Sequence, residues 1–208
     1  MIQEAFVLAG GASRRMGQPK ALMTLGGKTF LERILESLGE TIPRVFIVGS
    51  PPDPQRWKKW EIVPDILEGE GVLAGIHAGL SACKTHWAFV AACDVPAIDK
   101  RLPKLLWDEA TGREGCVMPY AQGFPQPTMA LYRAKEGVRI PTYLERTAET
   151  NLGRKLHGFL DRVGIQMVDE KFFVNRGIPR WSFSNCNDLR DYEQLCKEWK
   201  EAHADTTD

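Results

Sequence analysis

Short apolar runs alternate with helical patterns through the first hundred residues of the chain. The runs lack alternating polar positions, which is typical of strands covered on both faces of a parallel sheet. Four segments are predicted to be strands: Ala5–Ala9, Arg44–Val48, Glu61–Val63 and Trp87–Ala92. Between them, apolar residues recur at helical spacing over Phe30–Leu38, and Leu73–Ala82 is also predicted to be a helix. Strands that alternate with helices predict right-handed βαβ units, so we expect the α/β class with a doubly wound, mainly parallel sheet.

The pattern becomes less regular after the first hundred residues. Two predicted strands, Gly115–Pro119 and Pro127–Tyr132, are separated by a loop rich in glycine and proline, and we expect them to form a small accessory strand pair beside the main sheet. The remaining pattern predicts helices at Thr142–Glu149, Leu152–Leu160 and Asp188–Trp199 and a strand at Gly164–Val168. No repeat, low-complexity tract or linker divides the sequence, so we expect a single domain over residues 1–208.

Composition and charge exclude several classes of protein. Hydrophobic residues make up 43% and charged residues 26% of the chain, and 27 Lys and Arg balance 27 Asp and Glu. A dedicated nucleic-acid binder would carry a basic excess, so we expect no nucleic-acid partner. The apolar runs are far shorter than the roughly 20 residues of a membrane span, so we expect no membrane segment. Because the start also lacks the basic region of a secretory signal, we expect a cytoplasmic location.

The residues that most often build metal or nucleophile sites show no such pattern. The five cysteines are odd in number and scattered without a C-x-x-C pair, and the four histidines have no ligand spacing. We therefore expect reduced, mostly buried thiols and no zinc site. No G-x-S-x-G sequence is present, so nucleophilic catalysis by serine is not indicated.

The loop after the first predicted strand has the composition of an anion site. Residues Leu8–Lys20 include three glycines, two arginines and a lysine. Gly10 and Gly11 let the backbone approach a ligand and direct N–H groups at phosphate oxygens, while Arg15 and Lys20 supply positive charge. Ligands of open α/β sheets bind at the carboxyl ends of the strands, where this loop must lie. Because the P-loop and dinucleotide fingerprints are both absent, the residues alone leave two alternatives, a phosphate site and a basic surface turn.

A carboxylate follows the predicted strand Trp87–Ala92. Asp94 lies at the same carboxyl edge of the expected sheet as the glycine-rich loop. An aspartate before a turn that contains proline is usually a cap or turn former. Its place beside a phosphate loop favours a second reading, because carboxylate oxygen combined with nucleotide phosphates is how proteins commonly hold Mg2+. Asp94 is therefore a candidate metal ligand.

The sequence L-A-G-G-x-S-x-R-M-G-x-x-K, which begins at Leu8, resembles the signature of the MobA-like nucleotidyltransferases, whose founding activity is molybdenum cofactor guanylyltransferase. The resemblance runs from Ala5 to about Asp191 and implies a Rossmann-like nucleotidyltransferase fold. It also implies roles for the loop residues, in which Leu8, Ala9 and Gly10 contact the nucleotide, Gly11 and Ser13 shape the phosphate loop, and Arg15 and Lys20 bind the triphosphate.

Two more segments resemble motifs of this family on the nucleotide side. Cys93–Pro96 resembles its C-D-x-P motif, whose aspartate binds magnesium, and Gly71–Ile76 resembles its G-P-L-A-G-I segment with Val72 in the usual place of proline. The nucleotide contacts that the resemblance implies here are Asp65, Leu73, Gly75 and Asp94.

Two later segments resemble the family near its second substrate. Gln126–Tyr132 resembles an H/Q-P-x-x-A-L-Y strand, and Phe183–Asn187 resembles the start of an F-x-N-x-N-T-P-E-D-L element. The acceptor contacts that this implies are Gln126, Pro127, Asn185 and Asn187. The alternative for Asn187 is a simple cap of the helix that follows it.

The resemblance implies a Mg2+-dependent enzyme that moves GMP from GTP to molybdopterin, or its molybdenum-bound form, and releases pyrophosphate. Arg15, Lys20 and Asp94 would carry the catalysis. Residues 1–100 would be the nucleotide-binding half and 101–203 the acceptor-binding half, followed by a frayed tail at 204–208. The implied protein partners are other proteins of molybdenum cofactor biosynthesis or molybdoenzyme maturation.

Three alternatives remain open at this point. Guanylyltransferases often have an asparagine where this chain has Val48, so a cytidylyltransferase acting on the same pterin is one of them. A sugar-phosphate nucleotidyltransferase with the same loop is the second. The third is a non-catalytic nucleotide-binding or cofactor-chaperone module, against which the presence of both Lys20 and Asp94 argues.

Overall fold

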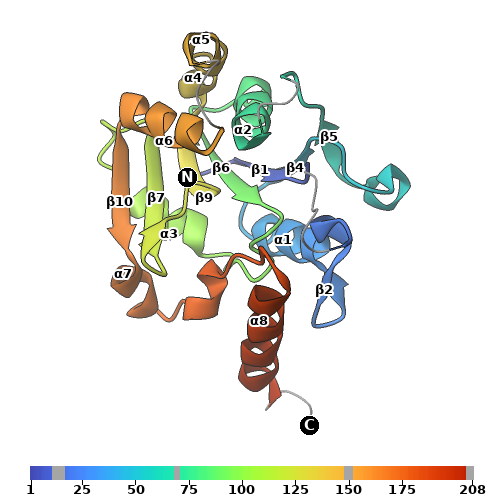
Figure 1. The fold of residues 1–208 in the computed structure, drawn as a ribbon. Coiled ribbons are helices and arrows are strands. Elements are labelled where there is room, and N and C mark those ends of the chain that lie inside the picture. The colour runs from blue at the N-terminus through green and yellow to red at the C-terminus, as the bar shows by residue number, and fades with distance from the viewer. Residues whose placement is uncertain (11–16, 68–70, 148–151, 205–208) are drawn as a thin grey trace.

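The computed structural model describes residues 1–10, 17–67, 71–147 and 152–204, without the side chains of residues 152–155. An eight-stranded sheet forms the centre of the described chain (Figure 1). Its strands are β1 (Glu4–Leu8), β4 (Arg44–Val48), β5 (Glu61–Val63), β6 (Trp87–Ala92), β7 (Cys116–Ala121), β8 (Phe124–Pro125), β9 (Met129–Arg133) and β10 (Ile165–Asp169). The predicted bounds of β4, β5 and β6 are confirmed, and β1 lies one residue before its predicted position.

The sheet is mainly parallel, as the sequence predicts. Its order is β10-β7-β9-β6-β1-β4-β5, with β8 paired to the end of β7. β1 pairs in parallel with β4 and β6, β4 with β5, and β7 with β10. β9 runs antiparallel between β6 and β7. The carboxyl ends of β1, β4, β5 and β6 therefore meet at one edge, and the predicted α/β class is confirmed.

A small accessory pair exists, but other residues form it. The strands expected to make this pair are β7 and β9, which belong to the main sheet because β9 pairs with β6 from Trp87 to Ala91. The separate antiparallel pair is β2 (Thr24–Leu25) with β3 (Lys28–Thr29), just before the first long helix. The composition of these four residues gave no strand signal, since a two-residue strand is too short for a pattern.

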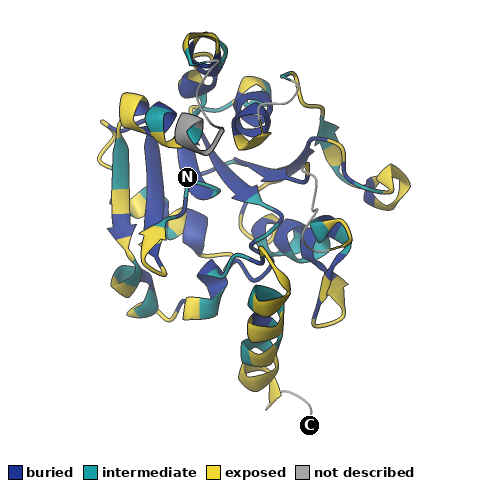
Figure 2. Cartoon of the chain, in the orientation of Figure 1, coloured by how far each residue is buried: buried dark blue, intermediate teal, exposed yellow. Residues whose placement is uncertain are grey.

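Helices cover both faces of the sheet (Figures 1 and 2). They are α1 (Phe30–Gly39), α2 (Gly71–Ala82), α3 (Leu102–Glu109), α4 (Ala134–Gly137), α5 (Ile140–Arg146), α6 (Leu152–Val163), α7 (Glu170–Val174) and α8 (Leu189–Ala202). Successive strand residues point to opposite faces. In β1, Ala5 and Val7 pack in the cluster that holds α1 and α3, while Phe6 and Leu8 pack with α2, α5 and α6. This two-layer burial explains the apolar runs without alternation.

Gly79 allows α2 to lie close to β1. A Cβ atom at this position would meet the Cγ atom of Phe6 at 2.9 Å, which is closer than real Cβ atoms approach. Phe6 is fully buried and stacks on Phe46 with ring centroids 5.0 Å apart, so its ring has no free space to move into. The absence of a side chain at Gly79 therefore fixes the distance between helix and sheet.

The last helix extends away from the sheet (Figure 1). Its buried residue Leu195 packs in a small cluster with Met23, Leu25 and Phe30. Asp188 caps α8, because its carboxylate accepts hydrogen bonds from the backbone N–H groups of Arg190 and Asp191. Among the described helices, none combines the length and the apolar character that a bilayer crossing requires.

Candidate active site

The loops at the carboxyl edge are joined by backbone hydrogen bonds that continue the sheet. The Ala9 N–H donates to the Val48 carbonyl at 2.9 Å, and the Cys93 N–H donates to the Leu8 carbonyl at 3.0 Å. The Gly49 N–H donates to the Val63 carbonyl at 2.9 Å. The first residues after β1, β4 and β6 are thus fixed relative to one another, so side chains placed there have defined positions.

Lys20, Asp94 and Asn187 meet at this edge. The Lys20 Nζ lies 3.3 Å from Asp94 Oδ2 and donates to Asn187 Oδ1 at 3.0 Å. The side chains of Lys20 and Asp94 are only 16% and 23% exposed, so their charges are partly shielded from water. The Cys186 N–H also donates to the Asp94 backbone carbonyl at 2.8 Å. Lys20 and Asp94 come together as the sequence predicts, and the C-terminal segment joins them.

The second carboxylate oxygen of Asp94 lacks a donor. Oδ1 is buried and accepts no hydrogen bond in the described part of the chain. A buried anionic oxygen without a partner is costly, and a bound cation would remove that cost. No group of three or more His, Cys, Asp or Glu side chains gathers as a metal cage within residues 1–10, 17–67, 71–147 and 152–204. Phosphate oxygens of a nucleotide and water could supply further ligands to a cation held by Asp94.

Asp65 faces the start of the glycine-rich loop. Its Oδ2 would lie 3.4 Å from a Cβ atom at Gly10 and 3.2 Å from one at Gly49. Gly49 has a φ of +94°, a conformation that favours glycine. A Cβ atom at Gly49 would also lie 3.2 Å from the backbone nitrogen of Gly10. Burial raises the pKa of the Asp65 carboxyl above its ordinary value. Sequence reasoning missed Gly49, although a glycine directly after a predicted strand was a usable signal.

The other nucleotide-side candidates are mostly inside the protein. Leu8 is 7% and Leu73 is 2% exposed, and both side chains pack in the cluster between β1 and α2. A Cβ atom at Gly75 would lie 3.1 Å from Leu8 Cδ2, so this glycine brings the start of α2 against the end of β1. Ala9 is also buried. Only backbone atoms of these residues are positioned to reach a ligand at the edge.

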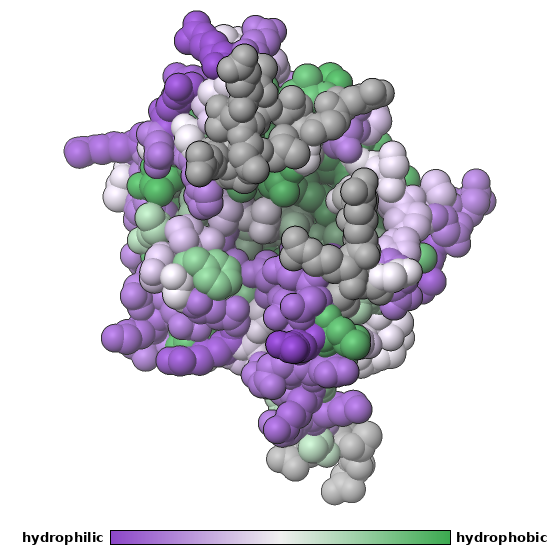
Figure 3. Space-filling model, viewed as in Figure 1, coloured by the Kyte–Doolittle hydropathy of each residue, from purple (hydrophilic) through white to green (hydrophobic). Residues whose placement is uncertain are grey.

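Gly11, Ser13 and Arg15 lie outside the described residues. The region that the structure does describe has a hollow in the face seen in Figure 3, over β6, with hydrophobic residues inside it and hydrophilic residues around much of its rim.

Cys93 lies beside Asp94, and its pKa is raised to about 12, first because the thiol is buried and then because the Asp94 charge is close. A thiol with this pKa stays protonated and is a poor nucleophile at neutral pH.

Two acceptor-side candidates hold each other. The Gln126 side chain is 1% exposed, its Nε2 donates to the Ala121 carbonyl at 3.2 Å, and its Oε1 accepts from Asn185 Nδ2 at 2.9 Å. These bonds tie the β7–β9 connection to the C-terminal segment. Pro127 is half-buried, and its carbonyl accepts from the Tyr132 hydroxyl at 2.7 Å. Sequence patterns do not distinguish a polar residue that binds a ligand from one that joins two loops.

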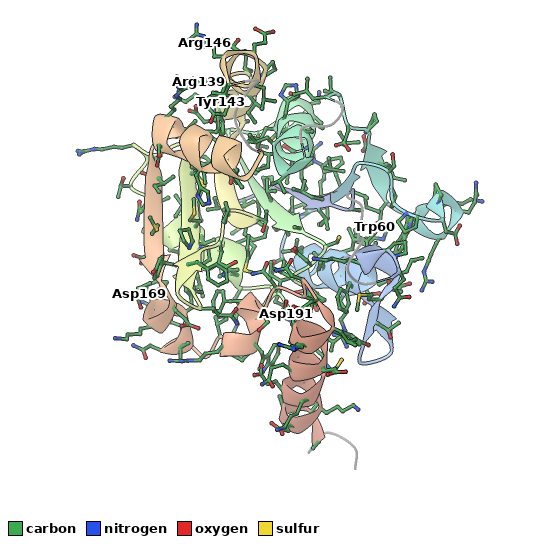
Figure 4. All side chains as sticks on the ribbon, viewed as in Figure 1. Trp60, Arg139, Tyr143, Arg146, Asp169 and Asp191 are labelled. Carbon is green, nitrogen blue, oxygen red and sulfur yellow. The ribbon has the colours of Figure 1, made fainter. Side chains whose placement is uncertain are left out.

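Asn187 does not cap α8, because Asp188 does. The Asn187 backbone N–H donates to the Asp191 carboxylate at 2.8 Å, and its side chain is left to accept from Lys20. Figure 4 labels Asp191 at the start of α8, beneath the end of the sheet. The cap alternative for Asn187 is therefore wrong, and its side chain faces the Lys20 ammonium group.

Comparison with known proteins finds a matching family model and similar proteins over most of the chain. The model of the MobA-like NTP transferase domain matches residues 5–162. A Bacillus cereus (strain AH187) protein named "Probable molybdenum cofactor guanylyltransferase" is 33% identical over 198 residues, which cover 92% of this chain and 94% of that protein. A Peptoclostridium acidaminophilum protein of the same name is 29% identical over 207 residues, covering 94% and 90%.

The solved structure of molybdopterin-guanine dinucleotide biosynthesis protein A from Archaeoglobus fulgidus has the same fold, with a TM-score of 0.77 and 23% identity, covering 96% of this chain and 100% of that one. The family model spans the glycine-rich loop and Asp94, and the relative from B. cereus matches over nearly its full length. The chain therefore belongs to the MobA-like NTP transferase family and is a nucleotidyltransferase.

Proposed function

We propose that the protein transfers GMP from GTP to molybdopterin, or to its molybdenum-bound form, and releases pyrophosphate. The meeting of Lys20, Asp94 and Asn187 at the carboxyl edge carries this proposal, since it places a cation, an anion and an amide beside the glycine-rich loop. The names of the similar proteins from B. cereus and P. acidaminophilum support the choice of guanylyl transfer in molybdenum cofactor biosynthesis.

The nucleotide would bind along the carboxyl ends of β1, β4 and β6. Backbone groups of Leu8, Ala9 and Gly10, with Gly11 and Ser13, would contact the nucleotide and its phosphates, and Arg15 with Lys20 would neutralise the triphosphate. Asp65 lies against Gly10 and Gly49 and would contact the nucleotide near the carboxyl end of β5. Leu73 and Gly75 would act by holding the start of α2 against β1, because their own positions are buried.

Asp94 is the residue that would hold Mg2+. Its buried Oδ1 without a donor among the described residues fits a cation ligand, and the Lys20 ammonium 3.3 Å from Oδ2 indicates that the position attracts positive charge. Mg2+ held by Asp94 would supply Lewis-acid chemistry, which neutralises negative charge on the phosphates of the nucleotide.

The chemistry needs no covalent intermediate with the protein. The terminal phosphate of the acceptor would attack the α-phosphorus of GTP in line and expel pyrophosphate. Lys20, Arg15 and the loop N–H groups would stabilise the charge that develops on the leaving pyrophosphate, while the elements around the cleft hold both substrates in position. The protonated state of the Cys93 thiol agrees with a mechanism that uses no protein nucleophile.

The acceptor would lie between the β7–β9 connection and the segment before α8. Asn187 is the proposed direct contact, because its side chain reaches the Lys20 ammonium at the centre of the site. For Gln126 and Asn185 we propose positioning roles, since each already binds the other at 2.9 Å and Gln126 is almost fully buried. Pro127 would shape the turn that carries Gln126.

The proposed organisation is one nucleotidyltransferase domain over residues 1–208. Its first hundred residues would bind the nucleotide and residues 101–203 the acceptor. The enzyme would act in the cytoplasm, where GTP is available, and would pass its product to other proteins of molybdenum cofactor biosynthesis or molybdoenzyme maturation.

The decisive experiment is a turnover assay with each of the four ribonucleoside triphosphates and molybdopterin, in Mg2+, with pyrophosphate release as the readout. We expect release with GTP that requires the acceptor and greatly exceeds release with CTP, ATP or UTP. A preference for CTP would replace guanylyl with cytidylyl transfer. Release with a sugar phosphate and not with molybdopterin would assign another acceptor. Tight GTP binding without release under any of these conditions would assign a binding or chaperone role.

A further inference from the structure

A cavity of about 330 Å³ lies between α5 and α6, far from the residues of the proposed active site in the fold. It is lined by Val138, Arg139, Thr142, Tyr143, Arg146, Phe159, Arg162 and Val163, which we call the arginine pocket. Arg162 and Val163 end α6 directly before β10 begins. Because β10 runs parallel to β7, and β7 runs in the same direction as β6, this end of the pocket lies at the amino edge of the sheet. Asp94 lies at the carboxyl edge.

Arginines lie along the solvent-exposed side of α5, beside its buried residues Ile140, Tyr143 and Leu144. Arg139, Thr142, Tyr143 and Arg146 are spaced i, i+3, i+4, i+7 and so share one face of the helix. Figure 4 labels the two arginines and Tyr143 on α5, at the top of the view. The opposite wall comes from Phe159 and Arg162 on α6. Arg139, Arg146 and Arg162 are exposed, so the arginine pocket carries three guanidinium groups on its solvent side.

Among the described residues, carboxylates compensate only part of the positive charge of the arginine pocket. Arg139 Nη1 lies 2.9 Å from Glu136 Oε2, which neutralises one guanidinium. Arg162 lies over the Tyr143 ring, 4.7 Å from its centroid, and the Tyr143 ring contacts that of Phe159 at 5.6 Å. Neither Arg146 nor Arg162 forms an ion pair with any described residue, and no carboxylate is among the lining residues. The pocket therefore presents net positive charge above an aromatic floor.

A second cavity shows what a compensated pocket looks like in the same chain. It also has a volume of about 330 Å³ and includes Arg33 and Arg101 among its lining residues. Asp99 lies in that lining, however, and accepts two bonds from the Arg101 guanidinium, while Arg33 donates to the Gly26 carbonyl. Its arginines are bound by other groups of the protein, whereas Arg146 and Arg162 of the arginine pocket form no ion pair with a described residue.

We propose that the arginine pocket binds an oligophosphate group. Guanidinium groups pair with phosphate oxygens through two parallel hydrogen bonds, which favours phosphate over smaller anions. Arg139 and Arg146 are seven residues apart, a rise of about 10 Å along a helix, so the positive charge is spread over more than a single phosphate covers. The volume of about 330 Å³ is at the lower end of the range for small-molecule sites, which fits a pyrophosphate or the phosphate chain of a nucleotide.

The test is calorimetric titration of the full-length chain with inorganic pyrophosphate and, in a parallel arm, with GTP. Both titrations use Lys20→Gln protein without divalent cation, so that the proposed active site contributes little. We expect one pyrophosphate site per chain, and Arg146→Gln added to this background should weaken binding about tenfold or more, the usual size of a lost charged hydrogen bond. Arg146→Lys should recover part of the loss, and Arg113→Gln, which removes another exposed arginine, should change nothing.

The outcomes separate the pocket from the proposed active site. Pyrophosphate binding that disappears in Lys20→Gln alone, or that is equal with and without Arg146→Gln, overturns the proposal and leaves the transferase proposal intact. GTP binding that also falls with Arg146→Gln identifies a nucleotide as the source of the phosphates, and a response to pyrophosphate alone identifies a free oligophosphate. Arg146 is exposed and ends its helix, so equal melting temperatures will verify that its variants are folded.

Discussion

Replacing Asp94 with asparagine removes one negative charge from the proposed active site and keeps the shape of the side chain. Oδ1 is buried without a donor among the described residues, and Oδ2 lies 3.3 Å from the Lys20 Nζ. If the carboxylate holds a cation against the nucleotide phosphates, a neutral amide is a poor substitute. Losing one preorganised electrostatic contact costs about 3 kcal/mol in the transition state, so turnover should fall about a hundredfold.

Stability should change little in the same variant. The Coulomb attraction of the Lys20–Asp94 pair at 3.3 Å is about 5 kcal/mol with an effective dielectric constant near 20, but most of it is offset by the cost of taking both charges out of water. The asparagine carbonyl can still accept from Lys20, and its NH2 group replaces an oxygen that has no hydrogen-bond donor among the described residues. We expect a net change within about 1 kcal/mol, or roughly 3 °C in Tm for a chain of this length.

The assay is the rate of pyrophosphate release against Mg2+ concentration, with Asp108→Asn as the matched control. Asp108 pairs with Lys104 on the exposed face of α3, so its variant loses the same charge from a lysine–aspartate pair elsewhere. We expect raised Mg2+ to restore part of the Asp94→Asn rate and the control to follow the wild type. Identical Mg2+ curves for wild type and Asp94→Asn would refute the metal assignment. A large Tm loss that Mg2+ does not repair would make Asp94 a turn former.

Three further substitutions test other parts of the argument. Asn187→Ala should raise the KM for molybdopterin more than that for GTP and leave Tm unchanged, because Asp188 caps α8; equal losses for both substrates would contradict an acceptor role. Glu4→Gln should cost about 2 kcal/mol at pH 7. Burial alone would raise the pKa of Glu4, but hydrogen bonds from the Cys83, Lys84 and Thr85 region lower it below 4.5, so this stability is present above that pH and is lost as pH falls through the lowered value. Urea unfolding at stepped pH should therefore show that Glu4→Gln loses less unfolding free energy than the wild type as the pH falls. An equal loss in both proteins would contradict these hydrogen bonds to Glu4. Gly79→Ala should destabilise the protein by about 2 kcal/mol, because the added methyl group meets the Phe6 ring, and unchanged urea unfolding would disprove that close contact.

The first hundred residues of the fold were readable from the sequence because β1, β4 and β6 are almost entirely buried and α1 and α2 have helical spacing between strands. Val45–Val48 and Trp87–Ala92 are continuous apolar runs for that reason. The direction and partners of Met129–Arg133 were not readable. A strand buried on both faces has the same pattern whether its neighbours are parallel or antiparallel, and β9 is antiparallel to both.

Part of the candidate site was also predictable from the sequence, and part of it was not. That Lys20 and Asp94 meet follows from parallel strands, because both residues come after strands that end at one edge of the sheet. The link to Asn187 depends on how α8 returns to the sheet, which no local pattern encodes. The burial of Gln126 was equally hidden, since a glutamine in a loop has the same sequence signal whether it faces solvent or holds a neighbouring segment.

The hydrogen bonds from the segment before α8 have a consequence for how the protein is made. Lys20 and Asp94 are synthesised early, but the Cys186 N–H that binds the Asp94 carbonyl and the Asn187 side chain that binds Lys20 are added much later. A nascent chain can pair β1, β4 and β6 before the proposed active site is complete. Translation that stops before residue 186, or proteolysis at that point, would remove both of these hydrogen bonds, so under the proposed function activity would report that the C-terminal segment is intact.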